Sequence, residues 1–99
     1  MLASPVNRVL VSAVTAWEIS IKQTLGRLEF PLDRFDDILQ QIGFNPLPVL
    51  PGHGIAAGRL PRLHNDPFDR MLIAQALTGG LTLVSYDNAV CRYPVPVLR

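Results

Sequence analysis

The pattern of apolar and polar positions divides the chain into short strands that alternate with helices. Two continuous apolar runs, Val9–Val11 and Leu81–Ser85, have the composition of buried strands. Between residues 14 and 25, apolar side chains recur every three or four positions, which predicts a helix that ends near Leu25. Gly26 is a suitable stop for this helix.

The rest of the chain follows the same alternation. The pattern predicts helices over residues 31–42, 51–60 and 68–78, and proline-containing edge strands over residues 44–50 and 95–98. Asp66 and Pro67 are a strong start for the last of these helices, because aspartate is favoured at the N-cap and proline at the first helical position. The alternation predicts an α/β fold with a parallel sheet, in one domain that spans residues 1–99. Only two or three strands are clear in the pattern, which is about one strand fewer than a parallel sheet covered by helices on both faces needs.

Composition narrows the class of protein. Hydrophobic residues make up 48% of the chain and charged residues 17%, which excludes a disordered polypeptide and predicts a compact core. The apolar runs are too short to span a bilayer and the first residues lack the order of a signal peptide, so we expect no membrane association. Cys91 is the single cysteine, so no internal disulfide is possible and a cytoplasmic location is expected. His53 and His64 are isolated from each other and are expected to be loop residues rather than metal ligands.

Three acidic residues stand at positions that are unusual for surface charges. Glu18 is in register with the apolar stripe of the first helix, and Asp69 with that of the helix over 68–78. Asp87 follows the strand at Leu81–Ser85. The carboxyl ends of parallel strands and the starts of the following helices meet at one sheet edge, so we expect these carboxylates to share a cleft. Such a cluster favours a hard divalent cation, Mg²⁺ or Mn²⁺, and phosphodiester hydrolysis.

Each of these acids also has a simpler interpretation. Glu18 has the spacing that completes a capping box with Thr15. Asp69 lies where it can complement the dipole of its helix, and Asp87 can be a turn former. If all three acids are structural, the chain is an α/β scaffold with an unrelated function. The net charge of +1 is too small for the electrostatic potential of the chain to indicate nucleic-acid binding by itself.

Three segments resemble motifs of PIN domains of the VapC toxin type. Residues 12–22, SAVTAWEISIK, resemble the SA-x-TAWEI-x-IK segment of that family, and residues 64–76, HNDPFDRMLIAQA, resemble its H-x-DPFDR-x-LIAQA segment. Residues 83–87, LVSYD, resemble its LVT-x-D segment. The motifs come in the family's order, and the resemblance extends from about Val6 to the C-terminus.

The resemblance implies a PIN-like fold, in which helices flank a parallel sheet and a carboxylate pocket binds Mg²⁺ or Mn²⁺. It implies an endoribonuclease that hydrolyses RNA as the toxin of a type II toxin–antitoxin system. The implied partners are the RNA substrate and the cognate antitoxin protein, and we expect the chain to form a homodimer. Antitoxins of such pairs commonly lay a helix across the toxin and insert a basic side chain into its acidic pocket.

Site residues follow from the match to the family's motifs. The implied catalytic and metal-binding residues are Glu18, Asp69 and Asp87. The resemblance gives Asp66 as a further acid near the pocket and Ser85 as a hydroxyl that orients the acidic cluster. Arg70 would flank the site, where it either meets a substrate phosphate or pairs with Asp66.

The chain departs from the family at its N-terminus. The family opens with a strand that ends LLDTH, whose aspartate is the first metal ligand, whereas residues 1–8 contain no acid. We therefore expect an N-terminally truncated PIN domain, without the strand that lies in the middle of the sheet. Unpaired backbone edges would then favour dimerisation or dependence on a partner. The alternative function is a catalytically weak or inactive PIN domain that binds an antitoxin or a second copy of itself.

Overall fold

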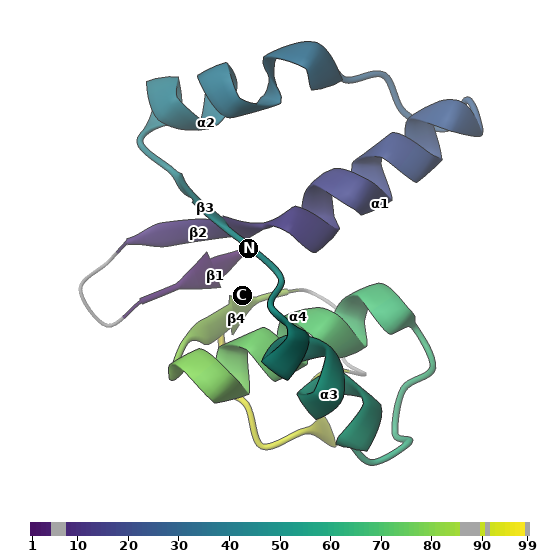
Figure 1. The fold of residues 1–99 in the computed structure, drawn as a ribbon, viewed down its shortest axis with the longest axis vertical. Helices are drawn as coiled ribbons and strands as arrows, with labels where there is room; N and C mark the ends of the chain where they lie inside the picture. Colours follow the sequence, from purple (N-terminus) through teal and green to yellow (C-terminus); the bar gives the residue numbers. More distant parts are fainter. Residues whose placement is uncertain (5–7, 86–89, 91, 99) are drawn as a thin grey trace.

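A computed structural model describes residues 1–4, 8–85, 90 and 92–98, and a five-stranded sheet with the order β3-β2-β1-β4-β5 runs through it (Figure 1). The strands are β1 (Leu2–Ala3), β2 (Val9–Ser12), β3 (Asn45–Leu47), β4 (Thr82–Val84) and β5 (Val97–Leu98). The helices are α1 (Ala13–Thr24), the 3-10 helix η1 (Leu32–Arg34), α2 (Phe35–Ile42), α3 (Pro51–Arg59) and α4 (Pro67–Gly79). This order is the predicted α/β alternation with one additional strand at its start.

The first residues of the chain form the centre of the sheet. β1 runs antiparallel to both neighbours, with Leu2 opposite Leu10 of β2 and opposite Leu83 of β4. The backbone N–H of Val84 also donates to the carbonyl of Met1 at 2.8 Å. Leu2 is completely buried. A two-residue antiparallel strand therefore lies at the middle of the sheet, where we expected none, while the truncation of the family's first strand stays a prediction. Among the described strands, β2 pairs in parallel with β3, and β4 pairs in parallel with β5.

Two hydrogen bonds close the connection between β1 and β2. The N–H of Ser4 donates to the carbonyl of Arg8 at 2.9 Å, and the N–H of Arg8 donates to Oγ of Ser4 at 3.1 Å. The apolar pair of residues that forms β1 lies between β2 and β4. A strand of two residues is too short to produce a periodic pattern, which explains why the sequence pattern does not predict it.

The start of α1 differs from the predicted one. Ser12 is the N-cap, and its Oγ accepts a hydrogen bond from the N–H of Val14 at 3.1 Å. Thr15 lies inside the helix, so the predicted capping box between Thr15 and Glu18 is wrong. A serine at the end of a strand satisfies the free N–H groups of the helix that follows directly, which makes a later cap unnecessary.

The other helix boundaries agree closely with the pattern. Asp66 is the N-cap of α4 and Pro67 its first residue, as predicted. Gly43 and Gly80 follow α2 and α4 with φ angles of 78° and 64°, the left-handed conformation that favours glycine. Within the described residues, every helix is too short or too polar to span a bilayer.

The core lies between the sheet and α4. Five consecutive residues of α4, Leu72–Ala76, are buried. Among the described residues, the buried core cluster comprises Leu2, Val14, Leu72, Ile73, Ala76, Leu81, Leu83, Val90, Tyr93 and Val95. In Figure 1, α2 lies at one end of the molecule and the packed pair of α3 and α4 at the other, with β2 and β3 between them. The middle of α4 is thus anchored in the core, while its first turn is only partly buried.

Candidate metal centre

Asp66 and Asp69 meet at the N-terminus of α4. Oδ1 of Asp66 accepts hydrogen bonds from the N–H of Phe68 at 2.8 Å and of Asp69 at 3.2 Å. These are two of the N–H groups that the start of a helix leaves without a helical partner. Asp69 lies in the first turn, and both acids are half-buried. The positive end of the helix dipole lowers the cost of holding two carboxylates side by side.

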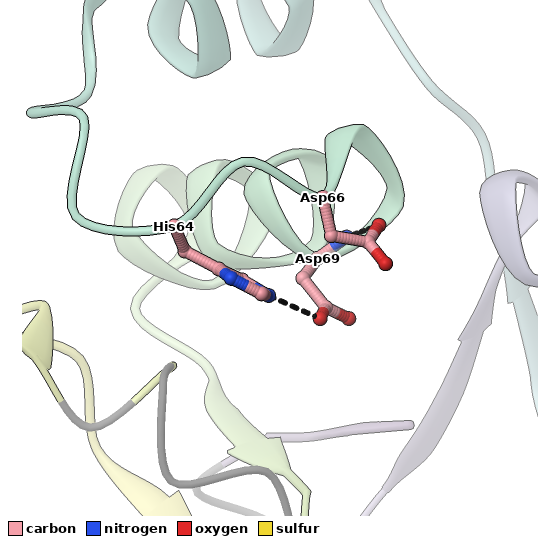
Figure 2. Close-up of side chains that lie close together, drawn as sticks. All are labelled: His64, Asp66 and Asp69. Atoms are coloured by element: carbon pink, nitrogen blue, oxygen red, sulfur yellow. Dashed lines mark hydrogen bonds and ion pairs between the residues drawn. The ribbon is translucent and has the colours of Figure 1, made fainter.

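His64 completes this group from the loop that leads into α4. Its Nε2 lies 2.8 Å from Oδ2 of Asp69, and Figure 2 shows the two side chains pointing toward each other. One potential ligand atom from each of His64, Asp66 and Asp69 lies within 4.8 Å of the others. We call these three residues the α4 cluster. Two carboxylates and an imidazole are a donor set that suits Mn²⁺ and, through its oxygens, Mg²⁺.

The loop that carries His64 is held by Tyr93. The hydroxyl of Tyr93 accepts hydrogen bonds from the N–H groups of Leu63 at 3.2 Å and His64 at 3.1 Å, and it donates to the carbonyl of Pro61 at 2.7 Å. Tyr93 is itself 3% exposed and belongs to the core cluster. The position of the imidazole is therefore fixed by the core and not only by its local sequence.

Arg70 holds the same loop from the other side. Its two Nη atoms contact five acceptors at 2.8–3.4 Å, which are the carbonyls of Ala57, Leu60, Pro61 and His64 and the hydroxyl of Tyr93. Within the described part of the chain, the guanidinium of Arg70 forms no hydrogen bond or ion pair with the carboxylate of Asp66, although such a pair was one of the two expectations. The two residues are joined only through the helix backbone, where the N–H of Arg70 donates to the carbonyl of Asp66 at 3.0 Å. The guanidinium instead ties α4 to the end of α3 and to the loop between them.

Glu18 lies on the neighbouring helix and is not part of the α4 cluster. It forms an ion pair with Lys22 one turn further along α1, with 3.3 Å between Oε2 and Nζ. The helices α1 and α4 are nevertheless in contact, because Trp17 and Phe68 pack edge to face with ring centroids 4.9 Å apart. Each of these aromatic residues is the sequence neighbour of a predicted ligand, Glu18 or Asp69. The two helices therefore run side by side at this point.

Ser85, a further predicted site residue, comes directly after β4. Ser85 is half-buried, and its N–H donates to the carbonyl of Leu98 at 3.2 Å. The predicted role of its hydroxyl stays a prediction. Asp87, the third expected carboxylate, lies outside the described residues.

His64 is the member of the cluster that sequence reasoning missed. It was expected to be a loop residue, and it does lie in a loop, but its ring reaches Asp69. The available signal was its place two residues before the Asp66-Pro67 helix start, and so close in sequence to the acids of the first turn. An isolated histidine gives no metal-type spacing by itself, so the pattern alone could not assign it.

Fold and site together define a small α/β protein with carboxylates gathered at the start of a helix. A family model described as PIN domain matches residues 1–96. The chain therefore belongs to the PIN domain family, whose members are generally nucleases and typically depend on divalent metal ions. Comparisons with curated proteins and with solved structures found no match.

Proposed function

We propose that the chain is a metal-dependent endoribonuclease that hydrolyses RNA phosphodiester bonds. The observation that carries this proposal is the α4 cluster in a chain of a nuclease family. Clustered carboxylates repel one another, and a divalent cation bound between them relieves that repulsion. The family motifs add Glu18 and Asp87 to this site.

The residues of the chain have separate tasks in this function. Asp69 and Asp66 would hold Mg²⁺ or Mn²⁺, together with Glu18 and Asp87 as the motif resemblance implies. Such an ion supplies an activated water and stabilises the oxygen that leaves the phosphate. His64 holds Oδ2 of Asp69 and so fixes the orientation of that carboxylate. Glu18 could share the role of general base, for which it must leave its ion pair with Lys22.

The more specific role that we propose for this ribonuclease is that of the toxin in a type II toxin–antitoxin system. It is supported by the SAVTAWEISIK and HNDPFDRMLIAQA segments, which follow the VapC pattern closely. Trp17 is 58% exposed, and Leu25 and Leu28 are also exposed, so α1 and the residues after it offer apolar surface to a helix of an antitoxin. Co-expression with the protein encoded next to it tests this assignment. A stable complex that no longer cleaves RNA is expected, and failure of the two proteins to associate would contradict it.

A second candidate function is a partner-binding PIN domain with weak or no catalysis. One observation favours it: Glu18 is paired with Lys22 and is not part of the α4 cluster. Such a protein would bind an antitoxin or a second copy of itself without turning over RNA.

One experiment separates the two functions. Purified protein is incubated with RNA and Mg²⁺ or Mn²⁺, and Mn²⁺ affinity is measured by isothermal titration calorimetry for the wild type and for Glu18→Gln. The ribonuclease proposal expects cleavage, and an Mn²⁺ affinity that falls in the variant. Absence of cleavage with either metal, with equal affinities for the two proteins, would contradict it and favour the partner-binding function.

A further inference from the structure

A surface hollow of about 300 Å³ adjoins the α4 cluster and shares His64 with it. The residues that line the hollow are Gly58, Arg62, His64, Asn65 and Arg70. We propose that this hollow binds a phosphate group of an RNA strand, next to the phosphate that lies at the α4 cluster. The inference rests on the proposed function in taking RNA as the ligand.

The lining of the hollow has the chemistry of an anion site. Arg62 and Arg70 bring two positive charges and Asn65 brings an amide, and none of the described residues that line the hollow carries a carboxylate. A guanidinium group offers parallel N–H donors that match two phosphate oxygens. Gly58 adds no side chain, and a Cβ at this position would meet no other atom within 4 Å. The hollow is therefore open enough for a ligand and selective for negative charge.

Arg62 is the residue available for direct contact. It is exposed, and its guanidinium makes no hydrogen bond or ion pair in the part of the chain that the structure describes. The Nη atoms of Arg70, by contrast, already donate to backbone carbonyls and to Tyr93. Arg70 thus contributes its charge and holds the loop, while Arg62 provides free donors.

The loop that carries Arg62 is fixed before any ligand arrives. Arg70 donates to the carbonyls of Pro61 and His64, on either side of Arg62 in the sequence. Arg92 donates from Nη1 to the carbonyl of Leu63 at 3.2 Å. Because this backbone is already ordered, binding would order little more than the side chain of Arg62.

The position of the hollow assigns its phosphate to the same strand as the cleaved one. His64 contacts Asp69 through Nε2 and also lines the hollow, so the acidic and the basic site are contiguous. An RNA strand carries a phosphate at every nucleotide and can place one at each site. The acidic site would hold metal, and the basic site would fix the register of the strand.

The test compares Arg62→Gln with a matched control, Arg34→Gln. Arg34 is also exposed, but it belongs to η1, away from α4. Binding of a labelled single-stranded RNA is followed by fluorescence anisotropy in EDTA, so that no cleavage occurs. Arg62→Gln is expected to weaken binding by about 5- to 10-fold and to reduce the salt dependence of log affinity by about 0.7. Equal affinities and equal salt slopes for the two variants would overturn the proposal.

A second measurement identifies the ligand group. Inorganic phosphate is titrated into ¹⁵N-labelled wild-type protein and into the Arg62→Gln variant, with amide shifts as the readout. Shifts at His64 and Asn65 in the wild type only, which RNA then competes away, are expected. Shifts that RNA leaves in place would mean a site for free phosphate and would overturn the RNA subsite.

Failure of the nuclease proposal can be distinguished from failure of the phosphate-site proposal. Cleavage is assayed with Mn²⁺, whereas binding to the hollow needs no metal. A wild type that binds RNA through Arg62 without cleaving it would overturn the nuclease function and leave the phosphate site standing. RNA cleavage by the wild type, together with unchanged RNA binding by Arg62→Gln, would overturn the phosphate site and leave the nuclease function standing.

Discussion

The Nε2 atom of His64 and the Oδ2 atom of Asp69 lie 2.8 Å apart, so one of the two oxygens of the central carboxylate has a partner within the protein. Histidine and carboxylate pairs of this kind commonly orient metal-binding groups. Here the carboxylate is the expected ligand and the imidazole holds it, which leaves Oδ1 of Asp69 for a cation shared with Asp66. The arrangement makes Asp69 the residue whose charge the site depends on most.

Replacement of Asp69 with asparagine is expected to abolish metal-dependent RNA cleavage. Asparagine keeps the size of the side chain and can still pair with His64, but it removes the negative charge that attracts a cation. Mn²⁺ affinity measured by calorimetry should fall about 10-fold or more. Asp33→Asn is the matched control, because Asp33 is exposed in η1. Unchanged Mn²⁺ affinity in Asp69→Asn would rule out this residue as a ligand.

Two substitutions of Asp66 separate its structural role from its role toward metal. Oδ1 caps the N–H groups of Phe68 and Asp69, so Asp66→Ala should lower the free energy of unfolding by about 1 kcal/mol, measured by urea denaturation. Asp66→Asn retains a capping oxygen and should be nearly as stable as the wild type. Both variants lose the charge and should bind Mn²⁺ more weakly. If only Asp66→Ala binds less Mn²⁺, the acid serves as a cap alone.

Features that depend on neighbouring residues could be predicted from the sequence, whereas features that depend on distant contacts could not. The start of α4 is readable because Asp66 and Pro67 satisfy a local requirement of the helix. β1 is not readable, since its position depends on pairing with Leu10 and Leu83. An apolar pair of residues contains no information about the direction in which it enters a sheet.

In the candidate site too, the residues identified by a local pattern could be predicted, whereas the contacts that depend on distant residues could not. Asp69 stood out because an acid in register with an apolar stripe is unusual, and the structure places it with Asp66. The contact of His64 with Asp69 depends on a loop that Arg70 and Tyr93 hold through backbone groups. Because every residue has a backbone carbonyl, hydrogen bonds to these groups cannot be predicted from the residue types of the loop. The same bonds explain why Arg70, expected at a phosphate or at Asp66, lies among carbonyl groups instead.

Two glycine substitutions should change stability in opposite directions. Gly43 ends α2 with a φ angle of 78°, so Gly43→Ala should lower the free energy of unfolding by about 1 kcal/mol. Gly54 lies inside α3, where a Cβ would meet no other atom within 4 Å, so Gly54→Ala should raise it by about 0.5–1 kcal/mol. Urea denaturation followed by circular dichroism measures both. A stabilised Gly43→Ala variant would show that the helix ends differently.

Removal of the Tyr93 hydroxyl should affect both stability and the candidate site. In Tyr93→Phe, the N–H groups of Leu63 and His64 lose their acceptor and the carbonyl of Pro61 loses a donor, so the free energy of unfolding should fall by about 2 kcal/mol. Thr24→Val is the control, because it removes an exposed hydroxyl, which donates to the carbonyl of Ser20, and should change stability by less than about 0.5 kcal/mol. The loop that presents His64 should also become less ordered in Tyr93→Phe. Mn²⁺ affinity under native conditions should therefore decrease in this variant and stay constant in the control, whereas an unchanged affinity in both would mean that the imidazole contributes nothing to the site.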